Sequence, residues 1–145
     1  DVVCNHMGDM IDSGTSGYPT FHDDPSPYVL RWRTSKRPGG LFNNLAWFHN
    51  NGGIQSWVDP DQVLGELSSL DDLKTESPAV IAGLEDAMSW LIDVTDCDGF
   101  RIDTVKHGDM AFWQTWTPSL KKGQPSMGMP ATIPPRSILP QKCFR

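Results

Sequence analysis

The sequence has little cysteine, little positive charge and no long apolar run, and each shortage argues against one kind of site or partner. Its three cysteines, Cys4, Cys97 and Cys143, show no metal-like spacing, and an odd number gives no closed set of disulfides. Lysine and arginine total 12 against 18 aspartates and glutamates, and the net charge of −6 argues against a nucleic-acid partner. No apolar stretch reaches membrane-spanning length, so we expect no membrane partner either.

The end of the chain lacks acidic residues. Residues 122–145 contain four basic residues and no aspartate or glutamate. The same segment contains five prolines: Pro125, Pro130, Pro134, Pro135 and Pro140. Proline at this density excludes a long helix or a central strand, so we interpret residues 122–145 as an aberrant, proline-rich tail.

Most of the candidate catalytic residues lie in one short stretch, residues 97–107. The segment Phe100–Ile102 follows an Asp-Gly break and predicts a short strand. Side chains alternate along a strand, so Arg101 and Asp103 are expected on one face. A neighbouring cation keeps a carboxylate charged, which suits a nucleophile. The same Arg-x-Asp pair taken alone is more often a structural ion pair.

Strand and helix signals surround this stretch in an alternating order. The segment Asp1–Cys4 consists mainly of small residues that favour strands and predicts a buried strand. A helix is predicted from Pro78, with Ser77 as its N-cap, because apolar residues follow at three- and four-residue spacing as far as Thr95. Residues 108–121 predict the start of another helix. A helix that feeds a strand is typical of a parallel α/β fold.

Two stretches together resemble the motifs of a known family. Residues 99–103 (Gly-Phe-Arg-Ile-Asp), with Val105, Lys106 and His107 after them, resemble the nucleophile motif of the alpha-amylase family of glycoside hydrolases. Residues 1–6 (Asp-Val-Val-Cys-Asn-His) resemble the motif at the end of that family's third barrel strand. Two long motifs in the right order are far more specific than one short motif.

The resemblance implies the α/β fold class and, within it, a fragment of a (β/α)8 TIM barrel that runs from the third strand to the fourth helix. A complete barrel needs about 250 residues, whereas the sequence has 145. We therefore expect residues 1–121 to be a partial alpha-amylase-type catalytic barrel. Residues 7–69 are expected to be a loop-rich subdomain inserted after the third strand.

Aromatic residues recur through the expected subdomain. They are Tyr18, Phe21, Tyr28, Trp32, Phe42, Trp47, Phe48 and Trp57. Most are predicted to pack a small irregular core, while one or two could offer a flat face to a pyranose ring. The sequence does not say which.

The resemblance also implies roles for individual residues. Asp103 would be the catalytic nucleophile, and Arg101 would orient it and hold it charged. His6, Lys106 and His107 would bind sugar hydroxyls.

A calcium site is implied in the same way. Asn5, Asp72 and the backbone carbonyl of His107 would be its ligands, and calcium prefers such oxygen donors. Asp72 belongs to the segment Leu70-Asp71-Asp72-Leu73, which resembles a weaker motif of the family. The alternative for this segment is an Asp-rich turn that caps the next helix.

The implied activity is retaining hydrolysis of α-1,4-glucans such as starch and malto-oligosaccharides. The last glutamate is Glu85 and no histidine follows His107, so the family's general acid and its later His-Asp pair are absent. We expect the chain alone to be inactive. The alternatives are a glucanotransferase or α-glucosidase of the same family, and a non-catalytic carbohydrate-binding or interaction remnant.

Overall fold

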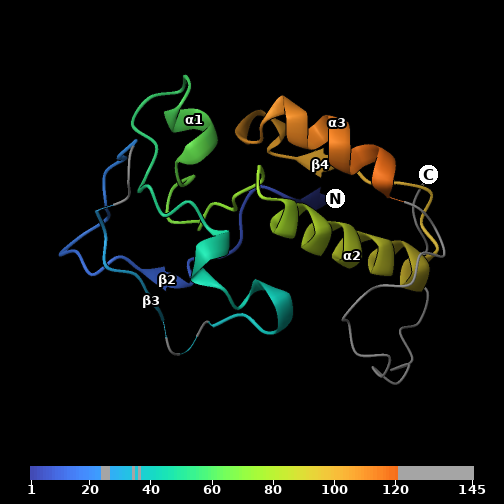
Figure 1. Cartoon of the computed structure of the whole chain (residues 1–145), viewed down its shortest axis with the longest axis horizontal. Helices are drawn as coiled ribbons and strands as arrows, with labels where there is room; N and C mark the ends of the chain where they lie inside the picture. The colour runs from blue at the N-terminus through green and yellow to red at the C-terminus, as the bar shows by residue number, and fades with distance from the viewer. Residues whose placement is uncertain (24–26, 34, 36, 121–145) are drawn as a thin grey trace.

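The structure is a computed structural model that describes residues 1–23, 27–33, 35 and 37–120. Figure 1 shows two long helices beside a pair of short strands at one end of the molecule, and a loop-rich region at the other. The elements in chain order are β1 (Val2–Val3), β2 (Ile11–Asp12), β3 (Arg31–Trp32), the 3-10 helices η1 (Gly40–Phe42) and η2 (Leu45–Trp47), α1 (Asp61–Leu64), α2 (Pro78–Thr95), β4 (Ile102–Asp103), the 3-10 helix η3 (Val105–His107) and α3 (Met110–Ser119).

Strands β1 and β4 pair in parallel, which brings the two motif-bearing stretches side by side. Val2 lies opposite Ile102, and Val3 lies opposite Asp103. Val2 is buried whereas Val3 is 39% exposed. The strand predicted for residues 1–4 is therefore present as Val2–Val3, but it is buried on one face only, because side chains alternate along a strand.

The buried face of this strand pair packs against α2 and α3. The residues shared by this core are Val2, Cys4, Val80, Leu84, Phe112 and Trp116. In α3, the rings of Phe112 and Trp116 stack with centroids 5.4 Å apart. The helix predicted to start after residue 108 is therefore present as α3, with Phe112 and Trp116 on its buried side, and the thiol of Cys4 is buried as well.

Helix α2 begins where the sequence predicts. Pro78 occupies its first turn, although the side chain of Ser77 makes no capping hydrogen bond. The helix ends at Thr95, and the capping residue after it, Asp96, adopts the left-handed conformation with φ 54°. Gly83 gives the ring of Trp47 room to pack against α2, since a Cβ there would lie 2.8 Å from a ring carbon.

The loop-rich region between β1 and α2 is held largely by polar contacts. Strands β2 and β3 pair antiparallel, and Ile11 lies opposite Trp32. The buried carboxylate of Asp71 accepts hydrogen bonds from the backbone N–H groups of Met10 at 2.6 Å and Ile11 at 3.0 Å. Of the aromatic residues predicted to pack here, Phe48 is fully buried.

The proline-rich tail predicted for residues 122–145, and Cys143 within it, lie outside the described residues. Among the helices that are described, none is long and apolar enough to cross a membrane.

Candidate functional site

Asp103 lies at the end of β4, where the strand turns into η3. Its side chain is exposed, and Oδ1 accepts a hydrogen bond from the backbone N–H of Thr104 at 2.8 Å. Thr104 has φ 59°, a left-handed conformation that is rare for a β-branched residue. Such strain is often found at functional sites. The turn holds the carboxylate of Asp103 on the open face of the strand pair.

Alternation predicts that Arg101 lies on the same face as Asp103. The guanidinium group of Arg101, however, pairs with a different carboxylate. Its Nε and Nη2 atoms donate to the two carboxylate oxygens of Asp1 at 2.7 Å and 2.6 Å. Asp1 precedes Val2 and therefore stands next to Arg101 across the parallel pair, whereas Asp103 lies two residues along the strand. The orienting role of Arg101 toward Asp103 stays a prediction.

His6 is half-buried close to the same carboxylate. Burial lowers the pKa of His6, the charge of His107 lowers it further, and Asp103 acts in the opposite direction. His6 therefore lies within electrostatic reach of both Asp103 and His107. A lowered pKa leaves the ring of His6 neutral near pH 7, with one nitrogen able to donate and one able to accept.

His6 is positioned by Asn5, which is completely buried. The Nδ1 atom of His6 lies 2.9 Å from Oδ1 of Asn5. On its other side, the amide of Asn5 donates to Oδ1 of Asp72 at 3.3 Å. His6 and Asp72 also face each other in an isolated antiparallel bridge. The structure thus brings three of the predicted site residues together.

The carboxylate of Asp72 is part of a buried network that includes His49. The Nδ1 atom of His49 lies 2.5 Å from Asp72, and its Nε2 atom lies 2.9 Å from Glu76. Burial alone would lower the pKa of His49, but the hydrogen bonds with Asp72 and Glu76 raise it to about 9. Burial raises the pKa of Asp72, and the hydrogen bond with His49 opposes that shift. His49 is therefore a cation that compensates a buried carboxylate.

Lys106 and His107 are hydrogen-bonded to α1, and these bonds connect the site with the loop-rich region. The Nδ1 atom of His107 donates to the backbone carbonyl of Gln62 at 2.9 Å. The side-chain amide of Gln62 donates in return to the backbone carbonyl of Lys106 at 3.0 Å. The side chain of Lys106 is exposed.

Reasoning from the sequence missed His49 and Gln62. No motif or spacing in the sequence marks either residue, because their partners lie 23 and 45 residues away. Buried polar groups need hydrogen-bond partners. The position of His49 directly after Phe48 was therefore the one signal in the sequence for such a partner.

The oxygen donors expected for calcium are partly assembled. Asn5 and Asp72 are in contact and fully buried, and both supply hard oxygen atoms. The third expected ligand, the carbonyl of His107, belongs to η3. Within the described ranges no cluster of three or more His, Cys, Asp and Glu residues could hold a metal ion. A site built from an amide, one carboxylate and a carbonyl does not require such a cluster, so calcium stays a prediction.

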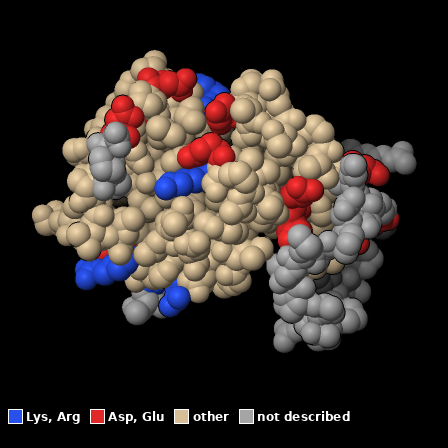
Figure 2. Space-filling view, in the orientation of Figure 1, with Lys and Arg blue, Asp and Glu red and all other residues tan. Residues whose placement is uncertain are grey.

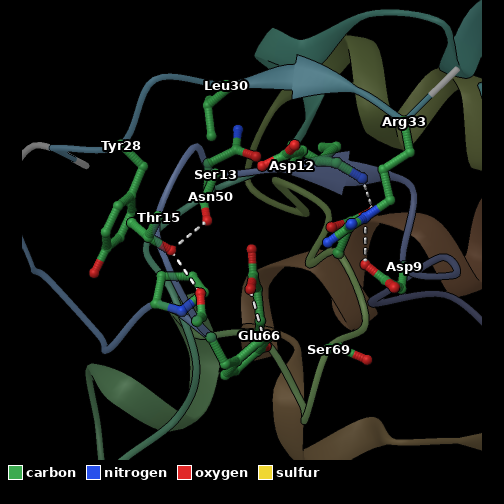
Figure 3. Close-up of a pocket in the computed structure, with 15 residues that line it drawn as sticks. Asp9, Asp12, Ser13, Thr15, Tyr28, Leu30, Arg33, Asn50, Glu66 and Ser69 are labelled. Carbon is green, nitrogen blue, oxygen red and sulfur yellow. Dashed lines mark hydrogen bonds and ion pairs between the residues drawn. The ribbon is translucent and has the colours of Figure 1, made fainter.

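A separate cavity of about 360 Å³ lies in the loop-rich region. Figure 3 shows Glu66 pointing into it, and Arg33 paired with Asp9 at one side. None of the predicted catalytic, sugar-binding or metal-binding residues lines this cavity. The predicted site is therefore the rim around Asp103 and not this cavity.

Acidic side chains are scattered over the face shown in Figure 2, with Lys and Arg between them. The described residues on that face form no broad basic surface, in agreement with the net charge of −6.

Comparisons with known proteins identify the family of the chain. The family model described as Alpha amylase, catalytic domain, matches residues 1–128 and so continues past residue 121, where we predicted that the barrel segment ends. An alpha-amylase of Streptomyces lividans is 30% identical over 86% of this chain and 18% of its own length. A cyclomaltodextrin glucanotransferase of Klebsiella oxytoca is 36% identical over 63% of this chain and 14% of its own.

Two solved structures resemble the fold. An Anoxybacillus alpha-amylase superposes with a TM-score of 0.54 and 31% identity over 83% of this chain and 22% of its own. The alpha-amylase of Geobacillus thermoleovorans, solved with acarbose, gives a TM-score of 0.51 and 35% identity over 56% of this chain and 19% of its own. The chain thus spans about a fifth of the length of these relatives. Since the family model covers most of the sequence, including both motif-bearing strands, the chain belongs to the alpha-amylase family.

Proposed function

We propose that this chain carries the nucleophile side of a retaining glycosidase site that acts on α-1,4-glucans. The observation that supports this most is the position of Asp103, exposed at the end of β4 and within electrostatic reach of His6. Retaining hydrolysis of a glucan requires a carboxylate at the anomeric carbon and polar groups at the sugar hydroxyls, and the rim around Asp103 offers both.

The chemistry begins at Asp103. Its carboxylate oxygen attacks the anomeric carbon, a C–O ester bond forms, and the bond to the leaving oxygen breaks. His6 and His107 hold sugar hydroxyls through their ring nitrogens, and Lys106 donates from the exposed rim. Arg101 turns from Asp1 to Asp103 when the sugar is bound and keeps the carboxylate oriented.

A second carboxyl group is required to complete turnover. In retaining enzymes it stands about 5–5.5 Å from the nucleophile, protonates the leaving oxygen and then activates water. No glutamate follows Glu85 in this sequence, so the chain has no group in that role at the expected place. We expect the 145-residue chain to release no reducing ends from starch.

The extent of the barrel segment is also a proposal. We propose that β1 and β4 are the third and fourth strands of a (β/α)8 barrel, with α3 as the fourth helix and residues 7–69 as the inserted subdomain. The parallel pairing of β1 with β4 and the packing of α2 and α3 on one face support this assignment.

Calcium binding by Asn5, Asp72 and the carbonyl of His107 is proposed from the chemistry of these donors. Calcium bound there would supply positive charge behind His6 and would compete with the hydrogen bond between Asn5 and Asp72. Calorimetric titration with calcium tests it. Binding to the unaltered chain that is lost in Asp72→Asn supports the site, and equal binding to both contradicts it.

The nucleophile is tested with a substrate whose leaving group needs no proton. In an α-maltosyl fluoride that carries a second fluorine on the reacting ring, fluoride departs as the Asp103 oxygen bonds to carbon, and the ester then breaks down slowly. We expect intact-mass spectrometry to show one added maltosyl group and peptide mapping to place it on Asp103.

Two variants control this experiment. Asp103→Asn should not be labelled, whereas Asp98→Asn, which changes another exposed aspartate near β4, should be labelled like the unaltered chain. Labelling at another residue, or none at all, would contradict the proposed function.

A glucanotransferase is the second candidate, since a cyclomaltodextrin glucanotransferase is among the relatives. The two activities share the same ester intermediate and differ in whether water or a sugar hydroxyl accepts it. Adding maltose to the labelled chain and analysing the products separates them. Maltotetraose as the released product favours transfer, and maltose without a longer product favours hydrolysis.

A further inference from the structure

The cavity in the loop-rich region is lined by more negative than positive side chains. Arg33 is the one cation among the described residues that line it, and the carboxylates are those of Asp9, Asp12, Glu66 and Asp71. Arg33 pairs with Asp9, and Arg31 pairs with Asp12, each at 3.0 Å. Among the described residues, no cation forms a salt bridge with Glu66 or Asp71. The cavity therefore has two carboxyl groups whose charges the described chain does not pair.

These two carboxyl groups are buried and influence each other. Glu66 is 8% exposed and Asp71 is 3% exposed. The hydroxyl of Tyr18 donates to Oε2 of Glu66 at 2.9 Å. Burial raises the pKa of Asp71 to about 7, the backbone hydrogen bond from Met10 opposes that rise, and the charge of Glu66 adds to it. A positive charge in the cavity would favour the ionised form of both groups.

Asn50 supplies an independent sign of a missing partner. It lines the same cavity and is only 5% exposed, and Figure 3 shows it on the opposite side of the cavity from Glu66. Its side-chain nitrogen donates to the backbone carbonyls of Phe48 at 2.8 Å and Leu45 at 3.2 Å, which fixes the orientation of the amide. Its Oδ1 atom is buried and accepts no hydrogen bond from the described residues. Buried acceptors are normally satisfied, so this oxygen points to a donor in the cavity.

The cavity suits an organic cation better than a metal ion. A metal ion needs several ligand atoms around one point. Within the described ranges no cluster of three or more His, Cys, Asp and Glu residues could hold one. At about 360 Å³ the cavity has the size of a small-molecule site. Tyr18 and Tyr28 line it as well, and the faces of aromatic rings attract ammonium groups.

We propose that this cavity binds a small aliphatic amine in its ammonium form through Glu66, Asp71 and the unpartnered oxygen of Asn50. An ammonium group has three N–H donors and a positive charge, so it supplies a donor to the amide oxygen and a counter-charge to the two carboxylates. A neutral sugar would supply donors but no charge. The cavity contains none of the predicted catalytic residues, so this proposal does not rest on the proposed function.

The test measures binding of putrescine, a linear diamine, to the full 145-residue chain by calorimetry in about 0.15 M NaCl, which screens exposed charges. We expect one putrescine per chain and no binding of 1,4-butanediol, its neutral counterpart. Glu66→Gln removes a charge but keeps an oxygen for Tyr18, and it should weaken binding at least about tenfold. Asp98→Asn is the matched control, because it removes the same charge at an exposed position outside the cavity and should leave binding unchanged.

A second variant adds a group instead of removing one. Ser69 lines the cavity, so Ser69→Lys should place an ammonium group of its own there and abolish putrescine binding. Ser56→Lys adds the same charge at an exposed position outside the cavity and should bind like the unaltered chain.

Four results would overturn the proposal. They are equal binding of putrescine and 1,4-butanediol, equal weakening by Glu66→Gln and Asp98→Asn, binding of calcium but not of putrescine in a manner that Glu66→Gln abolishes, and no binding of putrescine to the unaltered chain at millimolar concentration. Labelling of Asp103 by maltosyl fluoride is independent of all four, so the failure of this proposal and the failure of the proposed function can be told apart.

Discussion

The two ends of this molecule bury different kinds of side chain. Around α2 and α3 the buried residues are mostly apolar, with Val80 and Trp116 fully enclosed. The loop-rich region buries apolar residues such as Phe48 and Leu73, but it buries charges and amides as well, including His49, Asp71 and Asp72. Long helices satisfy their own backbone, so their contacts can be apolar, whereas irregular loops need side chains as hydrogen-bond partners.

This difference explains where the candidate site lies. The open face of β1 and β4 belongs to the apolar end, while Asn5, Asp72 and α1 belong to the polar end or contact it. Asp103 is therefore held between a rigid strand pair and a hydrogen-bonded network. Mutations that disrupt each end separately test whether the two depend on different forces.

The largest effect is expected in the apolar core. Trp116→Ala should lower the free energy of unfolding by about 3–5 kcal/mol, because it removes a fully buried ring that stacks on Phe112. Met110→Ala changes a residue of the same helix that is 65% exposed, and it should cost less than about 0.5 kcal/mol. Urea unfolding of both variants measures the difference, and similar losses would contradict an apolar core at this end.

The next effect is expected in the polar network. Asp72→Asn keeps the size of the side chain but removes the charged partner of His49, which should cost about 1.5–3 kcal/mol. The loss should persist in 1 M NaCl because the pair is buried. Urea unfolding in a chelating buffer measures it. Asp98→Asn, which changes an exposed aspartate, is the control and should show no measurable change.

The parts that follow local rules could be predicted from the sequence. Periodicity and the Ser77-Pro78 start predicted the bounds of α2, and α3 lies within the residues that predicted the start of another helix. Alternation predicted that Arg101 and Asp103 share one face, and both residues are exposed. These features depend on residues a few positions apart, and local patterns encode such features well.

The rest depends on contacts between distant residues. Arg101 pairs with Asp1, which lies 100 positions away in the sequence, and not with Asp103. The register between β1 and β4 brings Arg101 and Asp1 together, and no local pattern reveals that register. His49 reaches Asp72 and Glu76 only because the loop-rich region closes on itself. A turn such as that at Thr104, with φ 59°, runs against the preference of its residue, so no propensity predicts it.

A smaller effect concerns pH. Burial raises the pKa of Glu66, the hydrogen bond from Tyr18 lowers it, and the charge of Asp9 raises it, with a net rise. A carboxyl group with a raised pKa holds its proton more firmly in the folded state, so ionising it costs stability as the pH rises above 4.5. Glu66→Gln removes that cost and keeps an oxygen for Tyr18. Its free energy of unfolding should therefore fall less than that of the unaltered chain between pH 4.5 and 7.5, and equal falls would contradict this.

The smallest effect is expected for the ion pair between Arg101 and Asp1. Although the two side chains meet through a pair of hydrogen bonds, they are 66% and 64% exposed, so water and salt screen their attraction. Asp1→Ala should therefore lower the free energy of unfolding by at most about 1 kcal/mol in 0.1 M NaCl, and the difference should vanish in 1 M NaCl. Urea unfolding at the two salt concentrations measures both values. A salt-insensitive loss as large as that of Asp72→Asn would mean that the pair stabilises the fold, and Arg101 would then not be free to turn toward Asp103 when a sugar binds.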